Sequence, residues 1–277
     1  SGLLLGFSWP TNGITFFIFF SLVPLLYIEK LTRKESIIKI YLYSSISFLI
    51  WNLISTYWLA YSTLFGMTFA VLLNTFIKAF IFTSYSFVCR KVNNKLSIIY
   101  FISSWIVFEK FHLNWDFSWP WLNLGNVFSE KIHWIQWYEF TGVFGGSFWV
   151  LITNYLVLVT VLDYIKTKNI NKYLVSYSVL FISLPITISL LLYDKNFETS
   201  NKIDFAILQP NIDPYNEKYG RSNFNILYEL EDWINTKIGS NKLILAPETY
   251  FSESPGFLLD KFNKSSFTDS LKNILNK

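Results

Sequence analysis

Long apolar runs dominate the first 193 residues of the chain. The hydrocarbon core of a bilayer is about 30 Å thick, so a membrane helix needs roughly 20 apolar residues. A shorter apolar run at 3–9 is consistent with the remainder of another crossing. The runs that predict membrane helices cover residues 13–28, 38–60, 65–88, 96–110, 138–161 and 173–193. We therefore predict an α-helical transmembrane bundle as the first domain, residues 1–193.

Positive charge alternates between these runs. The connection at 61–64 has no Lys or Arg, and the connection at 111–137 has only Lys131. The basic connections lie at 29–39, 89–95 and 163–172. Because Lys and Arg accumulate in cytoplasmic loops, this pattern places the basic connections in the cytoplasm. Six crossings would then place everything after residue 194 on the opposite side of the membrane.

The pattern changes near Asp194, where polar residues become frequent. The segments "KIDFAILQ" (202–209) and "KLILA" (242–246) predict two buried strands, each followed by a proline. Residues 217–238, between them, have the spacing of a helix with Glu229 and Asp232 in solvent. The predicted buried face of this helix consists of Phe224, Leu227, Tyr228, Leu230 and Ile234. Strand, helix and strand predict a parallel βαβ unit that begins an α/β domain over residues 202–277.

Composition agrees with a lipid-facing surface. The chain is 52% hydrophobic, 20% aromatic and 15% charged, whereas soluble domains average about 25% charged residues. The formal net charge of +4 is modest, and we expect the bilayer rather than a nucleic acid as partner. The single cysteine, Cys89, excludes an intramolecular disulfide. It lies at the predicted cytoplasmic end of a membrane helix, and we interpret it as a structural thiol.

Glu248 is the first candidate for chemistry. It follows the proline that ends the second predicted strand, in "LILAPETYF" (243–251). In open α/β sheets, ligands bind outside the carboxyl ends of the strands, so this carboxylate is placed to transfer a proton there. The alternative is a solvated loop acid or a partner of a helix N-terminus.

Two further segments have structural and functional interpretations. The loop "FSWPWLNLGN" (117–126) contains Trp119 and Trp121, which favour anchoring at the membrane interface over a pocket. Three glycines at 142, 145 and 146 open a membrane helix and favour close helix packing. A phosphate cradle would need a preceding strand and a following lysine, and neither is present.

Ionisable residues near the membrane segments form the last group. Glu109, Lys110 and His112 end one predicted helix, where they are either functional or simply solvated. Asn74 and Lys78 share a face of another helix, and Lys78 would either extend to the interface or pair across helices. The only histidines are His112 and His133, too few at suitable spacing for a metal site. No metal or other cofactor is expected.

The segments in order resemble the bacterial apolipoprotein N-acyltransferases, the last enzymes of lipoprotein maturation. Each segment is weak evidence alone, but six in the correct order make the resemblance specific. They are "SWPTNGITFFIFFSLVPLL" (8–26), "SSWIVFEKF" (103–111), "FSWPWLNLGN" (117–126), "TGVFGGSFWVLITN" (141–154), "AILQPNIDPYNEKY" (206–219) and "LILAPETYF" (243–251).

The resemblance implies a multi-pass protein of the bacterial inner membrane. Its periplasmic domain would be nitrilase-like, an α-β-β-α sandwich, with a Glu, Lys and Cys triad. The cysteine would take a fatty acyl group from a phospholipid as a thioester. The acyl group would then pass to the N-terminal amino group of a diacylglyceryl-cysteine on an apolipoprotein. Glu248 matches the glutamate of the motif and would be the general base that activates the thiol.

Two departures from the family pattern matter. Tyr219 stands where the family often has a Trp linked to substrate contact, so it is a candidate substrate-binding residue. The triad Lys and Cys lie well beyond the glutamate in the family, but here no cysteine follows Glu248. The lysines that follow, in no motif context that matches, are Lys261, Lys264, Lys272 and Lys277. We therefore expect an N-terminal part of the enzyme, inactive alone, rather than a degenerate paralogue.

Two other function classes remain open. One is a non-enzymatic membrane protein, such as a transporter or scaffold, with a small exported domain. Transporters place polar residues near the bilayer midplane, and Asn52, Asn74 and Lys78 are the few candidates here. The other is a nitrilase-type amidase tethered to the membrane, which would not need so many membrane helices.

Overall fold

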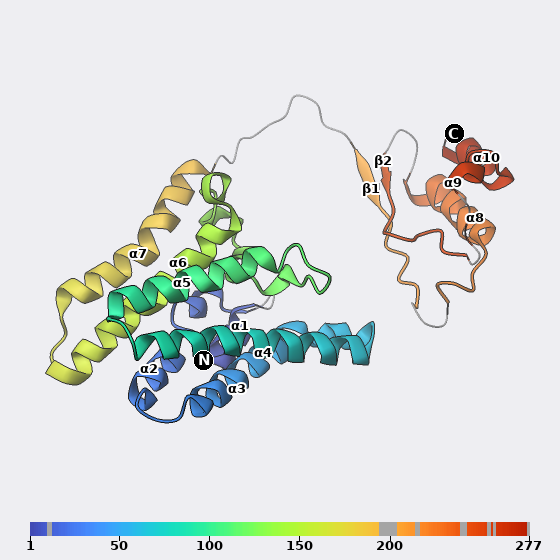
Figure 1. Ribbon diagram of the computed structural model, residues 1–277. Helices are drawn as coiled ribbons and strands as arrows, with labels where there is room; N and C mark the ends of the chain where they lie inside the picture. Colours follow the sequence, from blue (N-terminus) through green and yellow to red (C-terminus); the bar gives the residue numbers. More distant parts are fainter. Residues whose placement is uncertain are drawn as a thin grey trace. The chain divides into compact units, whose positions relative to one another are not determined.

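The computed structural model describes residues 1–9, 13–193, 204–213, 217–238, 243–253, 256 and 259–275. The chain divides into two units, Ser1–Lys195 and Asn196–Lys277, and each is considered by itself (Figure 1). Residues 202–203 and 242 of the predicted strands, and Lys277, lie outside the described residues.

The first unit is helical throughout its regular structure (Figure 1). Its α-helices are α1 (Gly2–Ser8), α2 (Val23–Thr32), α3 (Ile37–Thr56), α4 (Leu64–Cys89), α5 (Asn94–Phe111), α6 (Tyr138–Thr167) and α7 (Lys172–Leu192). Short 3-10 helices are η1 (Thr15–Phe19), η2 (Tyr57–Tyr61), η3 (Pro120–Leu122), η4 (Leu124–Phe128) and η5 (Ile132–Trp134). Four of these α-helices have an N-cap residue whose side chain accepts a hydrogen bond from an amide of the first turn. They are Ser36, Thr63, Asn93 and Asn171.

Five helical segments of the described chain are long and apolar enough to cross a membrane. They are Thr15–Thr32, Ile37–Tyr61, Leu64–Cys89, Tyr138–Thr167 and Lys172–Leu192. Five of the six predicted segments therefore meet this criterion. The sixth, 96–110, does form a helix, α5, but Lys95, Glu109 and Lys110 at its two ends make it less apolar than the others.

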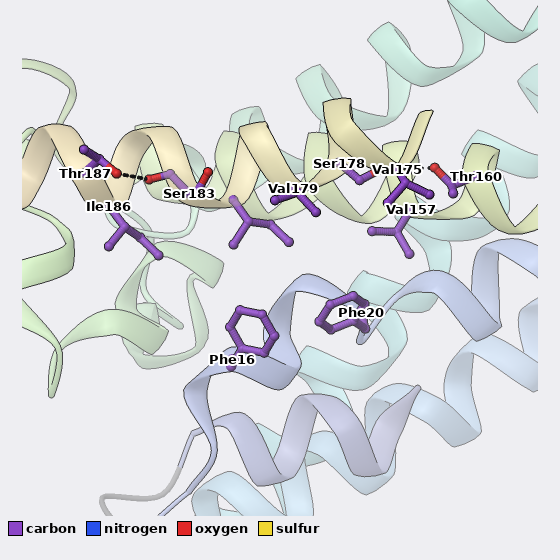
Figure 2. Close-up of a pocket in the computed structure, with 11 residues that line it drawn as sticks. Phe16, Phe20, Val157, Thr160, Val175, Ser178, Val179, Ser183, Ile186 and Thr187 are labelled. Atoms are coloured by element: carbon purple, nitrogen blue, oxygen red, sulfur yellow. Dashed lines mark hydrogen bonds between the residues drawn. The ribbon is translucent and has the colours of Figure 1, made fainter. Parts of the chain in front are cut away.

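The outer surface of this unit is apolar, as expected of helices that face lipid tails. Between η1, α6 and α7 it contains a groove of about 550 Å³. Figure 2 shows Val175, Val179 and Ile186 of α7 on one side of this groove, and Phe16 and Phe20 on the other. Three hydroxyl groups at its wall donate to backbone carbonyls one turn earlier: Thr160 to Leu156, Ser178 to Leu174 and Thr187 to Ser183.

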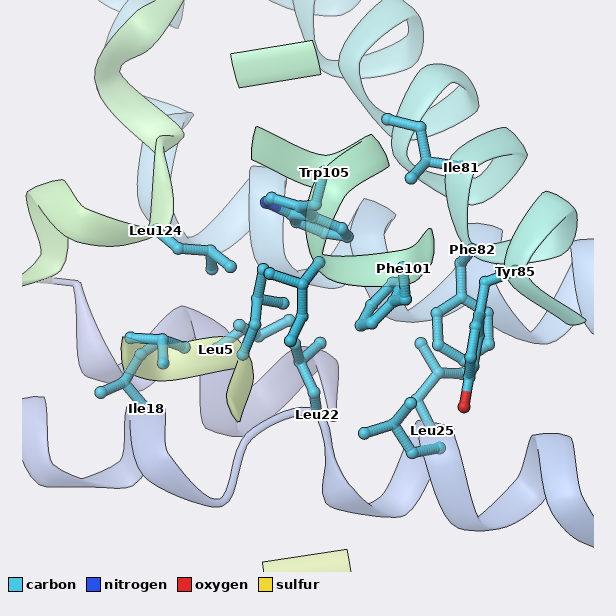
Figure 3. Packing of buried hydrophobic residues seen from close by; sticks show 14 of the residues in the cluster. Leu5, Ile18, Leu22, Leu25, Ile81, Phe82, Tyr85, Phe101, Trp105 and Leu124 are labelled. Carbon is cyan, nitrogen blue, oxygen red and sulfur yellow. The ribbon is translucent and has the colours of Figure 1, made fainter. Parts of the chain in front are cut away.

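Aromatic rings fill the core where α3, α4 and α5 meet (Figure 3). The rings of Phe82 and Phe101 pack edge to face, with centroids 5.8 Å apart. Trp105 contacts Phe101 and Phe48, at 5.7 Å in each case. Such pairs contribute roughly 0.5–1.5 kcal/mol each beyond the area that they bury. This packing holds α5 in the bundle despite its charged ends.

Glycines allow η4 to lie directly on the start of α6. A Cβ atom on Gly125 would come within 2.1 Å of the carbonyl oxygen of Val143. One on Gly146 would come within 1.7 Å of the Tyr138 hydroxyl and 3.0 Å of the Gly125 Cα. Gly142 has φ +63°, which breaks the helical geometry inside α6. The close-packing interpretation of the predicted glycine cluster is therefore confirmed for Gly146, whereas a Cβ on Gly142 would meet nothing within 4 Å.

The second unit contains a two-stranded parallel sheet with helices. Its strands are β1 (Phe205–Ile207) and β2 (Leu243–Leu245), paired in the register Phe205↔Leu243. Its helices are α8 (Asn223–Trp233), the π-helical turn η6 (Ile234–Ile238), α9 (Leu259–Phe262) and α10 (Ser266–Leu275). The predicted β-α-β order is therefore present, with shorter strands, but the nitrilase-like sandwich is not established by so small a sheet.

Two details of this unit differ from the prediction. The strands are not buried on both faces: Phe205 and Ile207 are 57% and 69% exposed. Helices cover one face of the pair, and no described residue covers the other, so alternate side chains face solvent. On α8, Tyr228 is 63% exposed, and Ile226, at 1%, is buried in its place.

Asn154 of α6 generates a prediction for the membrane unit. Its Oδ1 accepts from the Leu22 amide at 2.8 Å, and its Nδ2 donates to the Ile18 carbonyl at 2.8 Å. Asn154→Leu would leave the buried Leu22 amide unpaired, at a cost of roughly 1–3 kcal/mol, whereas the Ile18 carbonyl would keep its bond from the Ser21 hydroxyl. We expect the melting temperature in detergent to fall by several degrees, whereas Asn169→Leu, at an exposed position between α6 and α7, should leave it unchanged. Equal melting temperatures for the two variants would contradict this role.

Candidate functional site

A pocket of about 260 Å³ lies at the carboxyl ends of β1 and β2. Its lining comes from the two segments that leave the strands and from the chain before α8. These residues are Gln209, Pro210, Asn211, Ile212, Lys218, Pro247, Glu248, Thr249 and Tyr250. Glu248 therefore lies at the sheet edge where ligands of α/β proteins bind.

The backbone at this edge has two unusual conformations. Asn211 and Thr249 have φ of 51° and 57°, in the left-handed region. Asn tolerates this region, but a β-branched Thr rarely adopts it. Both residues closely follow a strand-ending proline and both line the pocket. Unfavourable conformations of this kind concentrate at functional sites, and here they turn both chain segments around the same cavity.

Lys218 supplies the positive charge of the pocket and is half-buried. Its amide donates to the Asp213 carbonyl at 3.0 Å, and its carbonyl accepts from the Ser252 hydroxyl. Tyr219 is 60% exposed and is not part of the lining. Its ring centre lies 5.8 Å from the Lys218 Nζ. The structure thus brings Glu248 and Lys218 to one pocket and leaves Tyr219 beside it.

Tyr250 forms the floor of the same pocket. It is 6% exposed, and its hydroxyl has no hydrogen-bond partner among the described residues. Burial raises the pKa of Tyr250 above its ordinary value, so the hydroxyl keeps its proton at neutral pH. Glu248, by contrast, is exposed. The pocket thus offers an accessible carboxylate and a protonated phenol, but no thiol, since the single Cys89 is buried in α4.

A second acid, Glu109, lies in the membrane unit and is only 1% exposed. Its Oε1 accepts from Trp105 Nε1 at 3.0 Å and from the Leu124 amide at 2.7 Å. Its Oε2 accepts from the Ser147 hydroxyl at 2.5 Å. The alternative in which Glu109 is solvated at the end of its helix is therefore wrong, because three donors replace water. Lys110, the next residue, is exposed.

Ser147 extends the bonding from Glu109 to the loop before α6. Its hydroxyl oxygen accepts from the Gly125 amide at 3.0 Å. The Gly125 carbonyl in turn accepts from the Tyr138 hydroxyl at 2.9 Å. Both backbone groups of Gly125 are therefore bound by α6 side chains, and this fixes η4 between α5 and α6.

His112 follows α5 and is 3% exposed. Burial lowers the pKa of His112 to about 4, so the ring is neutral at pH 7. Its Nδ1 accepts from Trp115 Nε1 at 2.8 Å. Among the described residues, no three His, Cys, Asp or Glu side chains form a group that could hold a metal.

Lys78 is buried in the bundle at 2% exposure. Its Nζ lies 4.2 Å from the centre of the Trp51 ring, so it pairs across to α3 through a cation–π contact. One turn earlier, Asn74 donates to Asn52 Oδ1 at 2.9 Å. Of the two predicted alternatives for Lys78, pairing across helices is the one that the structure has.

The comparisons with known proteins agree with this arrangement of the membrane unit. Residues 1–156 match the family model described as the apolipoprotein N-acyltransferase N-terminal domain. The chain belongs to the apolipoprotein N-acyltransferase family. The resemblance predicted from six short segments is thereby confirmed. The match includes Glu109, Ser147 and the Trp-rich loop.

A curated apolipoprotein N-acyltransferase of Chlorobaculum tepidum is 26% identical over 261 residues. The similarity covers 90% of this chain and 48% of the relative, so the chain spans about half the length of that protein. The similarity extends beyond residues 1–156 into the second unit, because it includes nine-tenths of the chain. No solved structure matches the chain.

The hydrogen-bond network of Glu109 is the main feature of this family domain that the sequence pattern did not reveal. Its partners Leu124 and Ser147 are 15 and 38 residues away along the chain. The signal was an acid at the end of a membrane helix, where ionisable residues are functional candidates by default. Here the acid accepts hydrogen bonds from α5, η4 and α6 and so holds these three elements together.

Ser147 tests this organising role. Ser147→Ala would leave the buried Gly125 amide without an acceptor and Glu109 without one donor, a loss of roughly 1–3 kcal/mol. We expect hydrogen exchange of the amides in Leu124–Phe128 to speed up by about 5- to 150-fold. Ser183→Ala on the exposed side of α7 is the control and should leave exchange there unchanged. Protection of η4 that survives Ser147→Ala would show that other contacts hold it.

Proposed function

We propose that this protein acts in N-acylation of apolipoproteins. A fatty acyl group would pass from a phospholipid to the N-terminal amino group of a diacylglyceryl-cysteine, through a cysteine thioester. The observation that carries the proposal is the family match over residues 1–156. The named activity of the Chlorobaculum tepidum relative supports it. Five apolar segments long enough to cross a bilayer suit two lipid-bearing substrates.

Glu248 would act as the general base. Its carboxylate would take the proton of the thiol, and the thiolate would attack the ester carbonyl of the phospholipid. The lysophospholipid alkoxide would leave with a proton, and the substrate amine would then displace the thiol to form an amide. A thioester divides one difficult transfer into two easier ones. The exposed position of Glu248 at the edge of a 260 Å³ pocket supports this role.

The thiol of this reaction is not among the residues of the second unit. No cysteine follows Glu248 in the sequence, and Cys89 is buried inside α4. The proposed reaction therefore requires a thiol that the described pocket does not contain, together with the triad Lys that the resemblance places beyond Glu248. Tyr219 would contribute a substrate contact, since its exposed ring stands beside Lys218 at the pocket.

We further propose that residues 202–277 belong to a nitrilase-like domain, an α-β-β-α sandwich. Parallel sheets occur with both faces covered. The apolar side chains of Phe205, Ile207, Leu243 and Leu245 are exposed on one face of the β1–β2 pair. A second layer over this face would bury them, as the sandwich architecture requires.

The membrane topology that the proposal needs has six crossings. As a helix of 18 residues, α5 spans about 27 Å, close to the thickness of the hydrocarbon core. Lys95 in its first turn and Lys110 in its last turn are exposed and would reach the two interfaces, whereas Glu109 is bound inside the bundle. Six crossings would place residues 1–193 in the bacterial inner membrane and residues 202–277 on its periplasmic side, opposite the basic loops.

A second candidate function is a non-enzymatic membrane protein, such as a transporter or scaffold. The buried cluster of Asn52, Asn74 and Lys78 favours it, because polar groups inside a bundle often mark transport pathways. However, Asn52 and Asn74 bond to each other and Lys78 packs on Trp51, so these groups bind one another rather than line a channel.

Glu248→Gln in the protein expressed from its gene tests the mechanism. The amide cannot take up the thiol proton, so we expect N-acylation of a diacylated lipopeptide to fall by at least 100-fold, given the typical 10²–10⁴-fold contribution of general bases. Glu217→Gln, an exposed acid outside the pocket lining, is the matched control and should keep full activity. Normal thioester formation and turnover in Glu248→Gln would remove this acid from the mechanism.

The sidedness of the second unit can be checked separately. Single cysteines introduced at Asn225 and at Lys34, both exposed, would be labelled in whole cells with a membrane-impermeant maleimide, in a Cys89→Ala background. We expect labelling at position 225 before lysis and at position 34 only after lysis. Protection of position 225 in intact cells would place Glu248 inside the cell and defeat the proposed reaction.

A further inference from the structure

A second polar pocket lies at the basic end of the membrane unit, where α2 and α6 end and α5 begins. Its walls include Lys30 of α2, Arg33 directly after α2, Asn94 of α5, and Tyr155 and Leu162 of α6. It encloses about 50 Å³. A volume of this size admits the oxygens of one phosphate, but not a whole lipid headgroup.

Arg33 is held in a fixed orientation at this pocket. Its Nε and Nη2 donate to the two carboxylate oxygens of Glu29 at 3.0 and 2.8 Å. Glu29 is 1% exposed and also accepts from the Ser86 hydroxyl at 3.1 Å. Both carboxylate oxygens of Glu29 therefore already accept hydrogen bonds. By contrast, the two N–H groups on Nη1 of Arg33 donate to no described residue.

Other donors around the pocket also remain available. Lys30 is exposed and forms no ion pair with a described residue. Asn94 is the first residue of the 18-residue helix α5, whose cap Asn93 accepts from the Leu96 amide. The first amides of a helix point outward and favour anions. The positive charges of Lys30 and Arg33 exceed the negative charge of Glu29, so the pocket has one excess positive charge.

The apolar part of the pocket wall indicates that the bound anion belongs to a lipid. Val159 and Leu162 of α6, which are partly exposed, continue from the pocket along a helix that is long and apolar enough to cross a membrane. An anion bound here would thus contact apolar side chains on its membrane side. Basic pockets between membrane helices bind lipid headgroups in this way.

We propose that this pocket binds the phosphodiester of an anionic membrane lipid. Lys30, the Nη1 group of Arg33 and the start of α5 hold the phosphate oxygens, and the acyl chains lie along α6. The site shares no residue with the pocket of Glu248, and the proposal does not depend on the proposed acyl transfer.

Lipid binding to the purified protein in detergent tests the proposal, measured by native mass spectrometry during titration with phosphatidylglycerol or phosphatidylcholine. We expect preferential binding of phosphatidylglycerol, weakened about fivefold by Lys30→Gln, since one basic residue near an anionic lipid contributes about that factor. Arg33→Lys, which keeps the charge but loses the paired bonds to Glu29, should also weaken binding. Lys34→Gln is the matched control, because Lys34 is equally exposed but lies outside the pocket.

Three results would overturn the proposal. The first is equal binding of the two lipids by the unmodified protein. The second is an equal loss on Lys30→Gln and Lys34→Gln, which would indicate a diffuse attraction to the basic loop. The third is displacement of the lipid by millimolar inorganic phosphate alone, which would make the site one for a free anion. Melting temperatures of the variants show whether each remains folded, and Lys30, on the surface, is not expected to affect folding.

Discussion

The buried carboxylate of Glu109 is the interaction on which the membrane unit depends. Three donors from three different parts of the chain converge on it: Trp105 in α5, the Leu124 amide in η4 and Ser147 in α6. In hydrocarbon there is no water to replace a missing donor. The loop between α5 and α6 must therefore close over the acid in one conformation, and the glycines at 125 and 146 give it the room to do so.

The same constraint explains how much of this unit could be predicted from the sequence. Apolar runs and loop charges indicate the membrane helices, since both follow directly from the bilayer's thickness and charge preference. The end of α5 could not be predicted so well. Glu109 and Lys110 are adjacent and look alike by position, yet one is buried and the other exposed. The difference comes from Ser147, whose contact with Glu109 no local pattern reveals.

In the second unit, the order of elements was predictable but the burial was not. Proline after each apolar segment indicated where β1 and β2 end, and hence which residues would meet at the sheet edge. The burial of the strand side chains depends on what covers each face of the sheet. A strand of three residues is too short for the alternation of apolar and polar side chains to reveal this. Tyr228 was misplaced for a different reason: Ile226, four residues before Leu230, shares the buried face of α8 with Leu227 and Leu230, and Tyr228 lies off that face.

The two acids of this chain show why position alone does not identify a base. Glu109 is buried and accepts three hydrogen bonds, so its carboxylate oxygens are used to join α5, η4 and α6. Glu248 lies exposed at a pocket, next to a protonated phenol and a lysine, with backbone strain on both flanking segments. The sequence around Glu248 is ordinary, but its exposed position at the pocket leaves the carboxylate free to react. We therefore expect Glu248, whose carboxylate is exposed, to take part in the chemistry of this family member. Glu109, whose carboxylate is fully hydrogen-bonded, is expected to stabilise its membrane part.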